Sequence, residues 1–118
     1  MPLYIADGSI DHITLKNVPE EFVIFYSSII DGEMWCPDCR LVEKLVKETF
    51  PEQGPEALIV YVGNKPQWKN PLNIYRQEPW KVTSVPTIVR LKDGKELGRL
   101  SNEVEILEKL TEFVGTSK

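Results

Sequence analysis

Two cysteines separated by two residues carry the clearest chemical signal in this sequence. Cys36 and Cys39 are the only cysteines of the chain, with Pro37 and Asp38 between them and Trp35 directly before. Two sulfur atoms at this spacing can form a disulfide with each other, so the pair can pass two electrons to a partner disulfide and then be reset. The motif therefore predicts thiol–disulfide exchange.

A helix start at the motif would make the first cysteine reactive. Apolar residues recur at helical spacing from Leu41 to Phe50, so Cys36 falls at the N-cap of a predicted helix, which Pro51 and Gly54-Pro55 end. Only a thiolate attacks disulfides, and an ordinary thiol has a pKa of about 8.5. Because free N–H groups and the dipole at a helix start favour the anion, we expect the first cysteine to attack.

The next three residues have distinct expected roles. Pro37 suits the first helical position, where its missing N–H costs nothing. Asp38 complements the helix dipole but repels a second anion, so the sign of its effect on the sulfur stays open, as does a role in proton transfer. Cys39 lies one turn further on and more buried, so we expect it to resolve the mixed disulfide.

The elements around the motif predict an α/β fold. Residues 22–26 and 57–62 are continuous apolar runs typical of buried strands, and with the helix between them they predict a right-handed parallel crossover. Residues 85–91 and 96–100 flank Asp93-Gly94 and predict an antiparallel hairpin. A helix from Glu103 to Val114 should close the chain.

That closing helix has recognisable ends. Asn102 is expected to cap it, with Glu105 reaching back, and Gly115 to end it. Its expected inner stripe consists of Val104, Leu107, Leu110 and Val114.

Weaker patterns occupy the remaining segments. Leu3–Ile5 and Ile13–Leu15 are short apolar pieces separated by Asp7-Gly8-Ser9, and they predict a brief strand or a turn region. Residues 27–34 are expected to form a loop with a turn at its Asp-Gly pair. Residues 63–79 are polar and proline-rich, with a possible short helix at 72–77.

Composition indicates one soluble globular domain over residues 1–118. Hydrophobic residues make up 42% and charged residues 27%, and the formal net charge of -4 without a basic cluster argues against nucleic acid. No apolar run approaches the ~20 residues that span a bilayer, and Met1 to Lys16 shows no secretory pattern. We therefore expect a cytoplasmic chain without a membrane partner.

Other chemistries lack their necessary residues. A zinc site needs two more ligands beside Cys36 and Cys39, and His12 is the only histidine, so zinc would need a bridged dimer. Hydrolase chemistry needs a histidine held near the nucleophile. No metal is therefore expected, and because the sequence has no glycine-rich dinucleotide motif, no bound flavin or other cofactor is expected either.

The element order and three motifs resemble the thioredoxin family. Matching residues run from Phe22 to Leu91 and include Trp35–Cys39, Gly63–Pro71 and Lys81–Thr87. Within the family the chain is similar to the small branch with Trp-Cys-Pro-Asp-Cys, the thioredoxin domain-containing protein 17 branch. The resemblance implies a thioredoxin fold, with a central mixed β-sheet flanked by helices.

The resemblance also implies roles around the sulfur pair. Trp35 would cover the sulfurs as an apolar platform; otherwise it is a partly exposed core aromatic. Pro86 matches the family's cis-proline, which would let the Val85 backbone pair with a substrate strand; otherwise it is a trans proline opening an edge strand. Trp68, with Lys65 and Lys69, would line a binding groove or simply pack.

One departure from the family concerns proton transfer. Ordinary thioredoxins carry an Asp in the core strand beneath the cysteines, and the matching residue here is Ile24. Asp38, Glu33 or Asp31 could substitute for that acceptor.

The implied activity is reduction of disulfides by a monomeric protein. Cystine and selected protein disulfides are the implied substrates, and an NADPH-dependent thioredoxin reductase is the implied electron donor. A redox-silent thioredoxin-like binding module is the alternative, which replacement of Cys36 would distinguish.

Overall fold

A computed structural model describes residues 3–6, 11–50 and 55–115 of the chain. Its central sheet has five strands in the order β1-β5-β2-β6-β7. The strands are β1 (Leu3–Ile5), β2 (Phe22–Tyr26), β5 (Ala57–Tyr61), β6 (Thr87–Lys92) and β7 (Lys95–Leu100). β5 runs parallel to both β1 and β2, whereas β6 is antiparallel to β2 and β7, so the predicted mixed sheet is confirmed.

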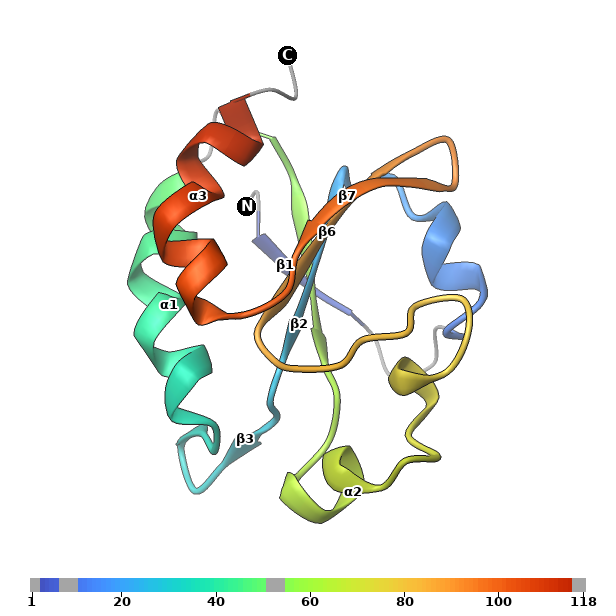
Figure 1. Cartoon of the computed structure of the whole chain (residues 1–118), viewed down its shortest axis with the longest axis vertical. Helices are drawn as coiled ribbons and strands as arrows, with labels where there is room; N and C mark the ends of the chain where they lie inside the picture. Colours follow the sequence, from blue (N-terminus) through green and yellow to red (C-terminus); the bar gives the residue numbers. More distant parts are fainter. Residues whose placement is uncertain (1–2, 7–10, 51–54, 116–118) are drawn as a thin grey trace.

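Helices α1 (Pro37–Thr49) and α3 (Glu103–Gly115) pack together on one face of the sheet (Figure 1). The other face is covered by shorter segments: the 3-10 helix η1 (Thr14–Asn17), helix α2 (Lys65–Lys69) and the 3-10 helix η2 (Ile74–Arg76). None of the helices in the described part of the chain is long and apolar enough to cross a membrane.

β2 forms the centre of the core, as its apolar run predicts. All five of its residues are buried. Phe22 packs edge-on against Phe50 of the α1 end and Phe113 of α3, whereas Phe25 packs against Trp80 on the opposite face. Alternate residues of a strand point to opposite faces, so Phe22, Ile24 and Tyr26 lie on the face covered by α1.

Two segments differ from the structure predicted for them. Residues 27–34 contain the small hairpin of β3 (Ile29–Ile30) and β4 (Glu33–Met34) rather than a plain loop. The predicted helix at 72–77 is only the 3-10 turn η2, while α2 forms earlier, capped by reciprocal bonds between Asn64 and Gln67.

The closing helix has a different inner face from the one predicted. Asn102 accepts from the Glu105 N–H at 2.9 Å, and the Glu105 carboxylate accepts from the Ser101 N–H, so the capping prediction holds. However, Val104 and Leu107 are exposed, and Ile106 is buried with Leu110 and Val114. The predicted turn at 7–9 and the stop signals at 51 and 54 lie outside the described residues.

Candidate active site

α1 begins at the cysteine pair, as predicted. Cys36 is its N-cap in extended conformation (φ −88°, ψ 118°), and Pro37 occupies the first turn with its ring exposed. The Cys36 carbonyl accepts from the N–H groups of Cys39 at 3.1 Å and Arg40 at 3.3 Å. The helix start therefore fixes the positions of both sulfur atoms.

Ser27 joins the end of β2 to both cysteines. Its hydroxyl oxygen accepts from the Cys36 N–H at 3.1 Å, and its own N–H donates to the Cys39 sulfur at 3.4 Å. The side chain is wholly buried. Sequence reasoning missed this residue, and the only signal was a hydroxyl directly after a buried strand.

The two thiols differ in accessibility, and burial changes the acidity of Cys39. Both are free; Cys36 keeps 9% of its surface exposed and Cys39 none. Burial raises the pKa of the Cys39 thiol to about 12, against a smaller lowering by the hydrogen bonds from Ser27, and neighbouring Cys36 raises it further. Cys39 therefore stays protonated in the folded protein at neutral pH.

The loop before β6 faces the outer cysteine. The Val85–Pro86 peptide is cis, as the family resemblance implied. The Cys36 thiol donates to the Val85 carbonyl at 3.8 Å, and both Val85 and Pro86 are buried. The fold thus brings these two predicted site residues to the cysteine pair.

Trp35 is tied to the turn after β5. Its indole N–H donates to the Gly63 carbonyl at 2.8 Å, and the half-buried ring packs against the core. Gly63 has φ 120° and returns its own N–H to the Ser28 hydroxyl at 2.9 Å. A Cβ there would lie 2.9 Å from Gln67, so only glycine fits this junction.

The three acidic residues considered as proton acceptors occupy different positions around the site. Asp38 is half-buried in the first turn of α1, near the sulfurs. Asp31 occupies the exposed β3–β4 turn with φ 53°, and Glu33 forms an ion pair with Arg40. Ile24 is wholly buried in β2, so the core strand offers no carboxylate at that position.

The residues of α2 are mainly structural. Trp68 is buried, with the Arg76 guanidinium 3.9 Å from its ring centre and the Arg76 Nε donating to its carbonyl. Lys65 and Lys69 are exposed. Packing, rather than a groove wall, is therefore the role that these contacts support for Trp68. Within the described ranges, no three side chains of the metal-binding kind come together.

The sheet order and the cysteine pair at a helix start define a thioredoxin-like redox protein. Reduced thioredoxin of Schistosoma mansoni superposes with a TM-score of 0.61 over 97% of this chain and 99% of its own, at 17% identity, which shows the shared fold. The chain belongs to the family described as thioredoxin domain-containing protein 17-like, thioredoxin domain, whose model matches residues 7–114.

Two curated relatives support this assignment. The thioredoxin-like protein Clot of Oryza sativa is 31% identical over 94 residues, which are 73% of this chain and 68% of the rice protein. Thioredoxin domain-containing protein 17 of Mus musculus is 39% identical over 69 residues, covering 57% of this chain and 55% of the mouse protein. The match thus spans little more than half of the mouse relative's length.

The buried thiol predicts how stability depends on pH. Burial holds the Cys39 pKa at about 12 in the folded chain, well above that of the exposed thiol in the unfolded chain. Above pH 9 the unfolded chain loses a proton that the folded chain keeps, so the free energy of unfolding should fall as pH rises from 9 to 12. The slope should approach about 1.4 kcal/mol per pH unit.

Urea unfolding of the reduced protein from pH 7 to pH 11 measures this effect. A Cys39→Ala variant is the control, since it should lose most of the decline between pH 9 and 10. Equal declines in both proteins would contradict the assignment to Cys39.

Proposed function

We propose that this chain is a disulfide reductase in which Cys36 attacks the substrate and Cys39 resolves the mixed disulfide. The substrates are small disulfides such as cystine and the disulfides of selected proteins. The observation that carries the proposal is the difference between the two residues: Cys36 keeps 9% of its surface exposed, whereas none of the surface of Cys39 is exposed.

The first step is attack on the substrate. The Cys36 thiolate forms a bond to one sulfur of the substrate disulfide, the substrate S–S bond breaks, and the other sulfur leaves as a thiolate. Cys36 at the helix N-cap and the Val85 carbonyl beside it are the groups that would position the incoming disulfide. Trp35 would cover one side of the reacting sulfurs.

The second step releases the reduced substrate. Cys39 loses its proton and attacks the Cys36 sulfur, the mixed disulfide breaks, and the second substrate sulfur leaves with the electron pair. The chain is left with a Cys36–Cys39 disulfide. Ser27 donates to the Cys39 sulfur and accepts from the Cys36 N–H, and these two bonds would hold the cysteines in position for this short transfer.

The oxidised pair needs an external donor of two electrons. We propose an NADPH-dependent thioredoxin reductase, in keeping with the family to which the chain belongs. We also propose that the chain works as a monomer in the cytoplasm, a compartment that keeps dithiols reduced.

Trapping the mixed disulfide on a variant without the resolving cysteine tests the roles assigned to Cys36 and Cys39. A Cys39→Ser chain incubated with cystine should accumulate one half-cystine adduct on Cys36, because nothing displaces it. Mass spectrometry of the intact protein should show near-stoichiometric adduct, and NADPH consumption with thioredoxin reductase should fall by about 10²-fold or more.

The matched control is a Cys36→Ser chain under the same conditions. Its remaining thiol is wholly buried, so no adduct should form. Equal labelling of both variants, or an adduct only on Cys39, would contradict the assigned order of attack.

A further inference from the structure

Tyr26 places a polar atom in the core without a partner. Its side chain is the last of β2, next to Ser27, and is 2% exposed. Its hydroxyl is buried and accepts or donates no hydrogen bond among the described residues. A buried hydroxyl without a hydrogen-bond partner costs about 1–3 kcal/mol of folding free energy, so the presence of this hydroxyl in the core needs an explanation.

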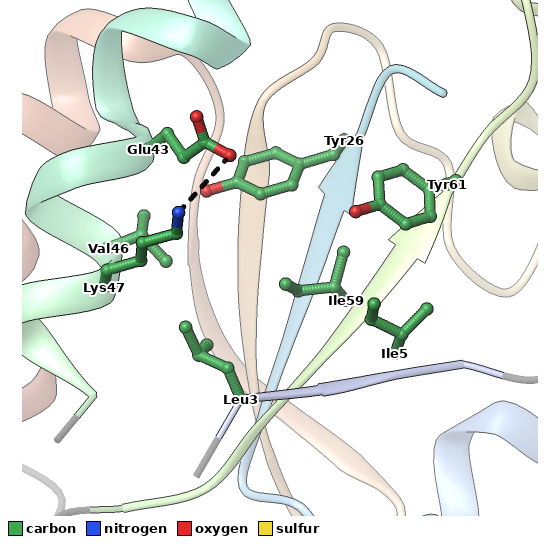
Figure 2. A pocket seen from close by; sticks show the side chains of 8 residues that line it. All are labelled: Leu3, Ile5, Tyr26, Glu43, Val46, Lys47, Ile59 and Tyr61. Carbon is green, nitrogen blue, oxygen red and sulfur yellow. Dashed lines mark ion pairs between the residues drawn. The ribbon is translucent and has the colours of Figure 1, made fainter. Parts of the chain in front are cut away.

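Tyr26 lines a cavity between the sheet and α1. Figure 2 shows the Tyr26 ring extending from β2 towards Glu43 and Val46 of α1, with Tyr61 of β5 beside it. The cavity has a volume of about 260 Å³, which is room for several water molecules. Its lining residues are Leu3, Ile5, Tyr26, Glu43, Val46, Lys47, Ile59 and Tyr61.

Tyr26 lies close to the resolving cysteine, because the N–H of the next residue, Ser27, donates to the Cys39 sulfur at 3.4 Å. Burial raises the pKa of Tyr26 most, and charge on Cys39 and then on Glu43 raises it further. Tyr61 differs, because its pKa is raised by burial and by Glu43 but not by Cys39. Cys39 and Glu43 stand four residues apart on α1, so they share one face of the helix.

Glu43 connects the cavity to solvent. Its side chain is 47% exposed and forms a loose ion pair with Lys47 at 3.9 Å. The cavity thus brings Tyr26 together with a partly exposed carboxylate, and Cys39 stands one helical turn before that carboxylate on α1.

We propose that the Tyr26 hydroxyl, with water held in this cavity, conducts the proton that Cys39 releases during resolution to the Glu43 carboxylate and to solvent. This inference rests on the proposed function. The Cys39 S–H proton passes along the hydroxyl and water to Glu43, while the Cys39 sulfur bonds to the Cys36 sulfur and the substrate sulfur leaves as a thiolate. The hydroxyl gives up one proton as it gains another, so Tyr26 ends unchanged.

The site needs such a path. Cys39 is wholly buried and protonated at neutral pH, and Ile24 leaves the core strand without a carboxylate. The titratable groups facing Cys39 and this cavity are Cys36, Glu43 and Lys47 from α1, Tyr26 from β2 and Tyr61 from β5, whereas β1 contributes only apolar side chains.

A chromogenic aromatic disulfide, 5,5′-dithiobis(2-nitrobenzoate), separates the two steps in one experiment. Attack by Cys36 releases a first coloured thiolate, and attack by Cys39 on the mixed disulfide releases a second. Tyr26→Phe should leave the rate of the first phase unchanged and slow the second about tenfold at pH 7, as loss of one proton-transfer group does. The difference should shrink above pH 9, where hydroxide can accept the proton.

Tyr61→Phe is the matched control, because it removes the other tyrosine hydroxyl of the same cavity. It should change neither phase, whereas Glu43→Gln should slow the second phase. The proposal is overturned if Tyr26→Phe resolves at the wild-type rate across the pH range, or if Tyr61→Phe slows resolution equally. Urea midpoints of all variants confirm that the fold is intact.

This design separates the inference from the proposed function. If the wild-type chain gave no second phase, or if Cys36→Ser kept the first, the assignment of the two cysteines would fail whatever Tyr26 does. If both wild-type phases appear and Tyr26→Phe changes neither, only the proton path fails.

Discussion

Replacing Cys36 by serine should reduce disulfide-reducing turnover by at least about 10³-fold, because a hydroxyl does not attack disulfides near neutral pH. The buried Cys39 cannot take over, since none of its surface is exposed. The substitution exchanges sulfur for oxygen at the N-cap of α1, a position that serine favours, so the fold should persist. Consumption of NADPH with thioredoxin reductase and cystine measures the loss.

The same variant separates an enzyme from a binding module. If the chain were a redox-silent module, the Cys36→Ser variant would still bind its partner, and the wild-type chain itself would show no turnover of disulfides. Wild-type turnover with cystine that survives in Cys36→Ser would remove Cys36 from the mechanism. Urea unfolding of the two reduced proteins serves as the control, and their midpoints should agree closely.

The long elements were predictable because their patterns are long. β2 and β5 are continuous apolar runs, and both are strands at nearly the predicted bounds. The hairpin of β6 and β7 forms around Asp93-Gly94, where both turn residues have positive φ. In these segments local propensity and burial favour the same structure.

Short elements were missed because they leave almost no periodicity. β3 and β4 have two residues each, too few for alternation to be visible, so only their Asp-Gly turn was predicted. α2 did leave a signal, since Asn64 and Gln67 stand at capping-box spacing around Pro66. That signal identifies the helix start better than the apolar residues at 72–77 do.

The inner faces of helices depend on what they pack against. α3 carries apolar residues over a wide arc, and its contacts with α1 and β7 turn Ile106 inward and leave Val104 and Leu107 exposed. Leu41 of α1 is likewise 61% exposed, although it fits the apolar spacing. A period of 3.6 gives the width of an apolar stripe but does not choose its centre.

The cysteine pair could be placed from sequence because the helix start, Pro37 and both sulfurs are local. Ser27 and Tyr26 could not, since their roles depend on where β2 ends against α1. The packing of β2 against α1 brings Ser27 next to Cys36 and Cys39, which follow it by 9 and 12 positions in the sequence.

Trp80 should be the most costly single truncation in the fold. It is the largest wholly buried side chain, packs against Phe25 with ring centres 5.1 Å apart, and donates its indole N–H to the His12 carbonyl at 2.7 Å. It therefore fastens both the N-terminal segment and the chain before β6 to the sheet. Trp80→Ala should lower the free energy of unfolding by about 3–5 kcal/mol, a large part of the 5–15 typical of such domains.

Urea unfolding followed by far-ultraviolet circular dichroism measures this loss without relying on tryptophan emission. Leu72→Ala is the control from the same segment: its side chain is 77% exposed, so the change should stay within about 0.5 kcal/mol. Phe25 of β2 lies two residues before Ser27, which bonds both cysteines just after the strand. Loss of the contact between Phe25 and Trp80 should therefore also loosen the position of Ser27. A Trp80→Ala chain that loses less than about 1 kcal/mol would mean that this face of the sheet is held by other contacts.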